Sequence, residues 1–309
     1  MPEFLPVLPS LRTTTQRFLN MKQTYKVAEH FFAIDAAPEL LAQLTNYAPF
    51  LTDESADSCL FTITAHVEPI PATEGWTSVY TDTSDDDMPR IEMYQRDGES
   101  LFCVSMYRDS AIECAMRCSA DWKRVELYLR PQTARFAIDN AAMLVYAFST
   151  VDKATLLFHS SVTVLEGKAY MFLGHSGTGK STHSQQWKAA FPQAELLNDD
   201  NPAVRIIDGK VIVYGTPWSG KTPCYKNAQA PVQALVQLAQ APENKIERLR
   251  MSQAYPYILA SVSGLKVLPH MMDRLFESIA QLLELRPVYK LECLPNVEAA
   301  QLCARTCSL

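Results

Sequence analysis

Residues 174–182 read Gly-His-Ser-Gly-Thr-Gly-Lys-Ser-Thr, which fits the phosphate-binding loop pattern G-x-x-x-x-G-K-[ST] at every fixed position. Glycines let the backbone curl so that successive N–H groups point at one anion. Lys180 adds a positive charge for the outer phosphates, and Ser181 offers a hydroxyl to Mg²⁺. The residues expected to bind a nucleotide are Gly174, Ser176, Gly177, Thr178, Gly179, Lys180, Ser181 and Thr182.

Two adjacent carboxylates follow this loop. Asp199 and Asp200 come about twenty residues after Lys180, after one helix and one strand. Near a triphosphate, one carboxylate can hold Mg²⁺ and the other can take the proton from an attacking hydroxyl. The alternative interpretation is a solvated turn before Asn201-Pro202.

His159 precedes the loop on a predicted strand. A hairpin through Gly167 would return its side chain to the level of Lys180. A lone histidine on a strand is usually structural, so a structural role and a role at the phosphates both stay open. His175 and His183 flank the loop, and we expect packing or solvent-facing roles for both.

A loop bounded by Gly215 and Gly220 offers two more candidates. Lys221 is a cation that such a loop could close over a substrate or a phosphate. Trp218 could stack on a ligand or cover the hydrophobic core, and the sequence favours neither.

The loop lies in the context that the motif needs. The apolar run 168–173 predicts a strand before it, and residues 182–191 predict a helix whose N-terminus faces the phosphates. Residues 156–164 predict a neighbouring strand, and residues 195–200 predict a strand ending in the two carboxylates. In a parallel sheet, that strand end would lie beside the loop.

The rest of the chain divides into two parts. Residues 1–135 predict a smaller β-rich domain with an irregular leader, and residues 136–309 predict an α/β domain with a mixed α+β sheet. Strands are expected over 21–27, 31–34, 60–67, 91–95, 100–106, 112–116, 124–129, 203–207, 211–214 and 288–293. Helices are expected over 38–47, 140–150, 231–239, 271–285 and 297–305.

Composition excludes several classes of protein. The chain has 309 residues, a net charge of −6 and no basic block, so nucleic acid is not an expected partner. It has no signal peptide and no run of about 18 apolar residues, so no membrane association is expected. Its eight cysteines form no C-x-x-C pair. Reduced thiols and a cytoplasmic location are therefore expected.

The order of His159-Ser160-Ser161, the phosphate loop and Asn198-Asp199-Asp200 resembles the HPr kinase/phosphorylase family. It is also similar to the nucleotide-binding half of phosphoenolpyruvate carboxykinase. The resemblance covers roughly residues 136–309 and is absent from residues 1–130. It implies a phosphate-loop domain of the kind that these two families share.

The resemblance also implies roles for individual residues. Lys180 would bind the β- and γ-phosphates, and Ser181 would bind the metal. Asp199 would be the acid/base and Asp200 a metal ligand, with the exchange of these two roles left open. His159 would bind phosphate or metal. HPr kinases commonly carry an acidic residue at the position of Thr182, and no arginine-bearing loop matches theirs, so the phosphorylase reaction is not expected.

The sequence therefore predicts a kinase that uses ATP and Mg²⁺ and phosphorylates a hydroxyl. The acceptor is a serine of a protein or peptide, or a small metabolite, and a second copy of the chain is a further candidate partner. Two alternatives stay open. One is a nucleotide-gated binding module without phosphoryl transfer, and the other is a carboxykinase-like lyase.

Overall fold

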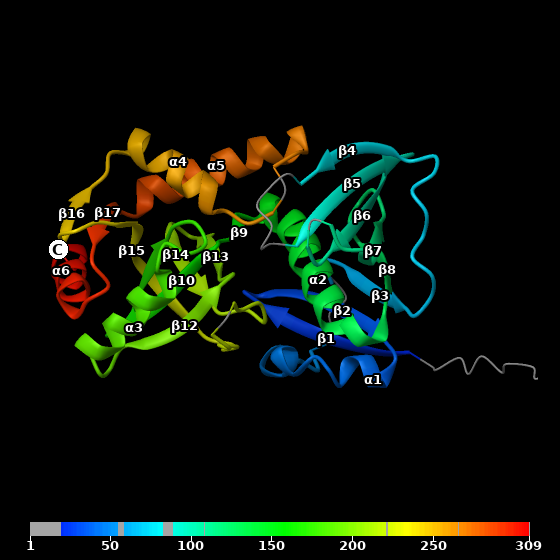
Figure 1. Cartoon of the computed structure of the whole chain (residues 1–309), viewed down its shortest axis with the longest axis horizontal. Coiled ribbons are helices and arrows are strands. Elements are labelled where there is room, and N and C mark those ends of the chain that lie inside the picture. Colours follow the sequence, from blue (N-terminus) through cyan, green and yellow to red (C-terminus); the bar gives the residue numbers. More distant parts are fainter. Residues whose placement is uncertain are drawn as a thin grey trace, which may run out of the picture.

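The computed structural model describes residues 20–54, 59–82, 89–107, 109–220, 222–264 and 266–308. These residues form two mixed β-sheets with helices packed against them, a mixed α+β fold (Figure 1). The first sheet and helix α2 (Ala134–Thr150) make up the right-hand part of Figure 1. The second sheet and the longer C-terminal helices make up the left-hand part.

The first sheet has eight strands in the order β1-β2-β3-β8-β7-β6-β5-β4. Strand β3 is parallel to both of its neighbours, and the other pairs are antiparallel. Its strands are β1 (Met21–Val27), β2 (His30–Ala36), β3 (Thr62–His66), β4 (Thr77–Thr81), β5 (Arg90–Arg96), β6 (Glu99–Ser105), β7 (Ile112–Cys118) and β8 (Arg124–Leu129).

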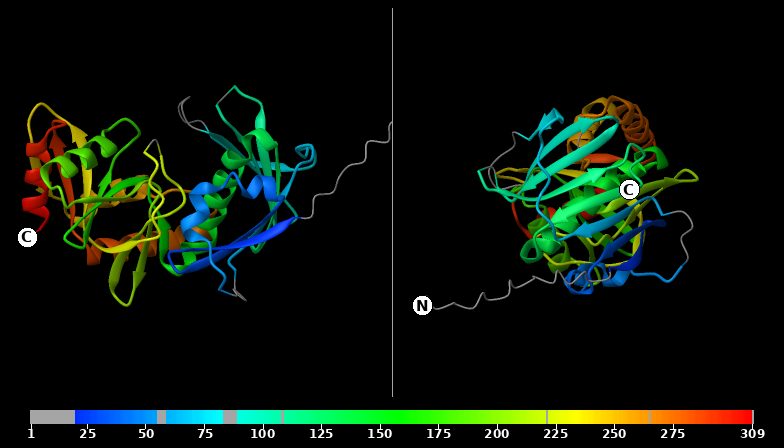
Figure 2. Two further views of the ribbon diagram at one scale, coloured as in Figure 1. Left: turned by 90° about the horizontal axis from the view of Figure 1, so that it is seen from below. Right: turned by 90° about the vertical axis from the view of Figure 1, so that its right-hand side faces the viewer.

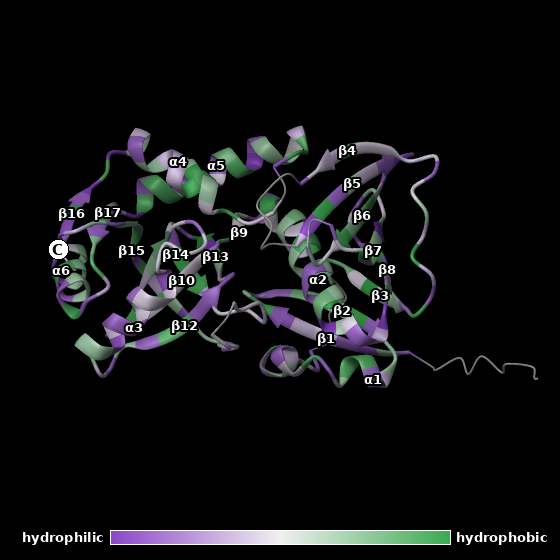
Figure 3. Cartoon of the chain, in the orientation of Figure 1, coloured by the Kyte–Doolittle hydropathy of each residue, from purple (hydrophilic) through white to green (hydrophobic). Residues whose placement is uncertain are grey.

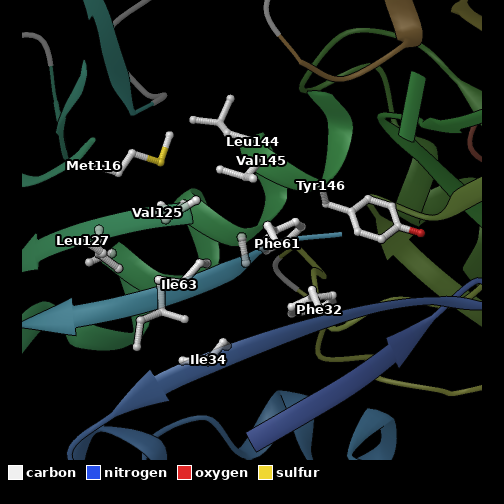
Figure 4. Packing of buried hydrophobic residues seen from close by; sticks show 14 of the residues in the cluster. Phe32, Ile34, Phe61, Ile63, Met116, Val125, Leu127, Leu144, Val145 and Tyr146 are labelled. Atoms are coloured by element: carbon white, nitrogen blue, oxygen red, sulfur yellow. The ribbon is translucent and has the colours of Figure 1, made fainter. Parts of the chain in front are cut away.

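Helix α2 covers one face of the first sheet. Its apolar residues Leu144, Val145 and Tyr146 pack against Phe32 and Ile63 of the strands (Figure 4). The same core includes residues of the second sheet, so it joins the two parts of the chain. The domain boundary between residues 135 and 136 stays a prediction. Short helices α1 (Pro38–Leu41), η1 (Thr45–Phe50), η2 (Pro131–Thr133) and η3 (Val151–Lys153) flank these elements.

The second sheet has nine strands, seven of them in the order β12-β10-β11-β15-β14-β13-β9. Strand β17 pairs with both β15 and β16. The strands are β9 (Thr155–Leu157), β10 (Ser160–Leu165), β11 (Lys168–Leu173), β12 (Glu195–Asp200), β13 (Ala203–Ile207), β14 (Lys210–Tyr214), β15 (Gln229–Gln240), β16 (Lys245–Arg248) and β17 (Val288–Cys293). The helices are α3 (Lys180–Ala190), α4 (Met251–Ser261), α5 (Pro269–Leu285) and α6 (Val297–Cys307).

Helices cover both faces of this sheet (Figure 2). Because side chains alternate along a strand, β11 contributes to two cores. Tyr170 and Phe172 pack with α3 and α6, whereas Met171 packs with α4 and α5. Helix α5 carries both polar and apolar residues (Figure 3), and its buried residues Leu275 and Ile279 lie one turn apart. This packing anchors the strand that leads into the phosphate loop.

Two sequence predictions were wrong in this part. Residues 231–239, rich in helix-forming residues, lie in strand β15, because ladders with β11 and β17 bury the segment between parallel neighbours. The single strand predicted over 156–164 is two strands, broken at Phe158 and His159. The backbone N–H of His159 donates instead to the carbonyl of Ser261, at 2.7 Å.

Two predictions from composition can be compared with the structure. All eight cysteines are free thiols, as their spacing indicated. Among the helices of the described residues, none combines the length and the apolar character needed to cross a membrane.

Candidate active site

The phosphate loop joins β11 to α3 with three glycines at positive φ. Gly177 (φ +80°) and Gly179 (φ +102°) hold left-handed conformations, and a Cβ on either would meet no atom within 4 Å. A Cβ on Gly174 would lie 2.9 Å from Cγ2 of Thr178, so the loop closes too tightly there for a side chain. Gly179 directly precedes α3, so the free N–H groups of the first helical turn border the loop. This open cradle fits a phosphate group.

Strand β10 brings the start of the phosphate loop and Asp200 to one edge of the sheet. Its first residue, Ser160, pairs with Leu173 on one side and with Asp200 on the other. Because β10 is antiparallel to both β11 and β12, these two strands run in the same direction and end at the same edge. The expected adjacency of loop and carboxylates is therefore present, with an antiparallel strand between them. His159, one residue before Ser160, lies between the loop and Asp200.

A chain of hydrogen bonds runs from the loop to a carboxylate. Nζ of Lys180 lies 2.8 Å from Nε2 of His159, and Nδ1 of His159 lies 3.0 Å from Oδ1 of Asp200. Since the ammonium can only donate, Nε2 accepts and the imidazole proton belongs on Nδ1. Burial lowers the pKa of Lys180, while the charges of Asp200 and Asp199 act to raise it. Lys180 also donates to the carbonyls of Gly174 (2.9 Å) and His175 (3.2 Å).

The second carboxylate faces the serine of the loop. Oγ of Ser181 donates to Oδ1 of Asp199 at 3.0 Å, and Asp199 is only 5% exposed. A hydroxyl beside a carboxylate is a pair of oxygen ligands of the kind that Mg²⁺ takes, alongside water and substrate phosphates. The donor set therefore fits Mg²⁺. Within the described residues, no three His, Cys, Asp or Glu side chains form a metal cluster.

Asp200 has a strained backbone, with φ at +152°. A residue other than glycine in this region costs energy and is often found at functional sites. Its second carboxylate oxygen accepts a hydrogen bond from Nδ2 of Asn201 at 2.9 Å, and Oδ1 of Asn201 accepts from Ser263 at 2.8 Å. Both oxygens of Asp200 thus have fixed partners, so its carboxylate is held in one orientation.

The loop after β14 holds the backbone of Asp199. The carbonyl of Asp199 accepts hydrogen bonds from the backbone N–H of Gly220 (2.6 Å) and from Oγ of Ser219 (3.1 Å). Asn201, Ser219 and Ser263 were missed by the sequence analysis. No local pattern marks these residues, because they reach the carboxylates only through tertiary contacts.

Trp218 covers the core and does not face a ligand site. It is 4% exposed, its Nε1 donates to the hydroxyl of Tyr47 at 3.1 Å, and its ring centroid lies 5.3 Å from that of Tyr146. This burial agrees with the second of the two sequence interpretations, in which Trp218 covers the hydrophobic core, and it leaves little of the ring exposed for stacking on a substrate. Lys221 lies outside the described residues.

The other two histidines differ from each other. His183 is buried, and its Nε2 accepts a hydrogen bond from Nε1 of Trp187 at 3.0 Å, so it has the packing role we expected. His175 is exposed on the loop.

Two large cavities adjoin the loop. One of about 700 Å³ is lined by residues 177–179, the start of α3, and the ends of β15 and β17. The other, of about 480 Å³, is lined by residues 174–176, His159, α4, α2 and β5. Both have the size of small-molecule sites.

No family model matches the chain, and no curated protein matches it. Among solved structures, the Hpr(Ser) kinase/phosphatase from Coxiella burnetii is similar over 48% of this chain and 86% of its own. The identity is 11% and the TM-score is 0.29. A likeness this distant carries no argument about the site, and the proposed function therefore rests on the geometry.

Proposed function

We propose that the chain is a kinase that transfers the γ-phosphoryl group of ATP to a hydroxyl, with Mg²⁺. One observation carries the proposal: Lys180 of a complete phosphate loop is linked through His159 to Asp200, while Ser181 of the same loop contacts Asp199. A loop that only binds a nucleotide does not need a pair of carboxylates beside it. Phosphoryl transfer needs both a metal ligand and a group that receives a proton.

The nucleotide would bind with its phosphates on the loop. Backbone N–H groups at the start of α3 and the ammonium of Lys180 would hold the phosphate oxygens. The cavity of about 700 Å³ continues from the second half of the loop, and it would take the nucleoside.

Ser181 and Asp199 would hold the metal ion. Mg²⁺ bound there supplies positive charge that offsets the negative charge on the phosphates. This assignment exchanges the roles first expected for the two carboxylates. The hydrogen bond from Ser181 supports the exchange, because it joins Asp199 and not Asp200 to the serine of the loop.

Asp200 would act as the base. The acceptor oxygen forms a bond to the γ-phosphorus, the bond from that phosphorus to its bridging oxygen breaks, and ADP leaves. The proton of the acceptor hydroxyl passes to the carboxylate of Asp200. His159 would orient this carboxylate through Nδ1 and hold Lys180 through Nε2.

Labelled ATP tests the proposal. The wild-type chain should bind ATP and turn it over, and Lys180→Ala should lose both. Lys210→Ala, at the exposed first residue of β14, should behave as wild type. Unchanged ATP affinity in Lys180→Ala would refute the site. Binding without turnover for any acceptor would favour the nucleotide-gated module, and release of CO₂ from oxaloacetate would favour the lyase.

A further inference from the structure

We propose that the cavity of about 480 Å³ beside His159 binds the acceptor, and that it selects an uncharged hydroxyl compound with an apolar body. This inference rests on the proposed function, because it assigns the second substrate of the same site. It concerns the chemical class of the acceptor, which neither the loop nor the carboxylates specify.

The cavity lies where the two parts of the chain meet. Its walls come from Ile91 of β5, Met143 of α2, and Tyr257 and Ala260 of α4, and it ends at His159 and the first half of the phosphate loop. Helix α2 lies on the side of the first sheet that faces the second part of the chain (Figure 1). A molecule bound here would touch the β-rich part while its hydroxyl reached the end of the cavity at His159, whose Nδ1 lies 3.0 Å from the carboxylate of Asp200, the proposed base.

The two cavities adjoin different halves of the phosphate loop. The larger one contacts residues 177–179, and the smaller one contacts residues 174–176. In phosphoryl transfer the attacking and leaving oxygens lie roughly in line on opposite sides of the phosphorus. Nucleotide and acceptor therefore need separate approaches to the same phosphoryl group, and the two cavities provide them.

The walls of the smaller cavity are largely apolar. Ile91, Met143, Ala260 and the ring of Tyr257 offer hydrocarbon surface, and each is partly or largely exposed, as accessible wall residues should be. Removing such surface from water favours binding of an apolar group. Asn140 adds a polar group, and its Nδ2 already donates to the carbonyl of Phe136 at 2.8 Å. Its Oδ1 could therefore accept a hydrogen bond from the acceptor.

Charge argues against an anionic acceptor. Among the described residues that line this cavity there is no lysine and no arginine. A carboxylate or phosphate on the acceptor would lose its hydration without gaining a cation in these walls. A neutral alcohol or a serine between apolar residues avoids this cost.

Three probes separate these classes. The full chain is incubated with Mg²⁺, γ-labelled ATP and either acetyl-Leu-Ser-Leu-amide, acetyl-Asp-Ser-Asp-amide or 3-methylbutan-1-ol. We expect at least one of the two neutral probes to be labelled tenfold or more above the acidic peptide. The peptide and alcohol arms then distinguish a peptide acceptor from a free small molecule.

Variants that fill the cavity complete the test. Met143→Trp should lower labelling of the neutral probe at least tenfold while the Kd for ATP stays within twofold. Ala260→Leu, at an exposed position on α4, repeats the test with little risk to folding. Met251→Trp, 47% exposed at the other end of α4, is the matched control and should change neither value.

The outcomes are distinguishable from failure of the proposed function. Equal or greater labelling of the acidic peptide, no labelling of any probe by a chain that binds ATP, or unchanged labelling in both filled variants would each overturn the acceptor inference. Absence of ATP binding in the wild-type chain would overturn the kinase proposal itself, and the acceptor inference with it.

Discussion

The ammonium of Lys180 donates a hydrogen bond to Nε2 of His159 at 2.8 Å, so the lysine of the phosphate loop is joined to a residue from a neighbouring strand. His159 in turn contacts Asp200 through its other ring nitrogen. A single side chain thus couples the group that would bind phosphate to the group that would receive a proton. This coupling gives the histidine a role that can be measured separately from nucleotide binding.

Replacing His159 should impair turnover more than binding. His159→Ala leaves Lys180 in place but removes the partner that orients Asp200, so we expect kcat to fall about 100-fold and the Kd for ATP to change about threefold or less. Steady-state kinetics and calorimetric titration measure the two effects. His66→Ala, a histidine of β3 in the first sheet, is the control and should leave kcat near the wild-type value. Equal losses in the two variants would argue against the coupling.

Replacing each of the two carboxylates should impair a different step of the reaction. Asp200→Asn cannot take a proton, so we expect ATP binding with normal Mg²⁺ dependence but a loss of transfer of about 100-fold or more. Asp199→Asn keeps the size of the side chain but weakens the oxygen pair with Ser181, so the Mg²⁺ concentration for half-maximal activity should rise about tenfold. Titration of Mg²⁺ in both variants shows which carboxylate binds the metal and which accepts the proton. The reverse pattern would restore the roles first expected from sequence.

Gly174 should be required for nucleotide binding. A Cβ there would lie 2.9 Å from Thr178, so Gly174→Ala must open the loop, and we expect the Kd for ATP to rise about tenfold or more. Gly209→Ala is the matched control, since its φ is +71° and its Cβ would meet nothing within 4 Å. It should cost about 1–2 kcal/mol of stability and leave the Kd unchanged. Parallel changes in Kd for both would contradict this account.

The fold should lose stability in mild acid. Burial lowers the pKa of His30 and of His183 from 6.5 to about 4, so the folded chain resists protonation that the unfolded chain accepts. The folded state therefore keeps its full stability above pH 6.5. As the pH falls from 6.5 towards 4, each histidine lowers the free energy of unfolding by roughly 2 kcal/mol. Urea unfolding at pH 7 and at pH 4.5 measures the free energy of unfolding at each pH. Between these two pH values, the double variant His30→Gln/His183→Gln should lose less of this free energy than the wild-type chain. An identical loss in both chains would rule out these histidines as the cause.

The hydrogen bond from Nε1 of Trp218 to the hydroxyl of Tyr47 should contribute to the stability of the fold. Tyr47→Phe leaves the buried Nε1 of Trp218 without its acceptor, so we expect a loss of about 1–3 kcal/mol. Urea unfolding measures this change, and Tyr107→Phe, at a residue 56% exposed, serves as the control. A midpoint unchanged in Tyr47→Phe would show that Nε1 finds another partner.

Local patterns predicted the elements that carry the loop. The apolar run before Gly174 is strand β11, and the residues after Gly179 form α3, because strand, glycine turn and helix each depend on neighbouring residues. Prediction failed for β15, whose residues favour a helix but lie between two parallel strands. It also failed to break the strand at His159, since the group that accepts its backbone N–H, the carbonyl of Ser261, is distant in sequence.

The amino-acid sequence by itself determined which groups are present for chemistry: a glycine loop with Lys180 and Ser181, and two carboxylates at a strand end. These features depend on residue type and short spacing, which the chain carries directly. Only the tertiary structure decided which carboxylate meets Ser181, which meets His159, and that Trp218 lies in the core. Those relationships arise from pairing and packing between residues far apart in the chain, and the register of β10 between β11 and β12 determines them.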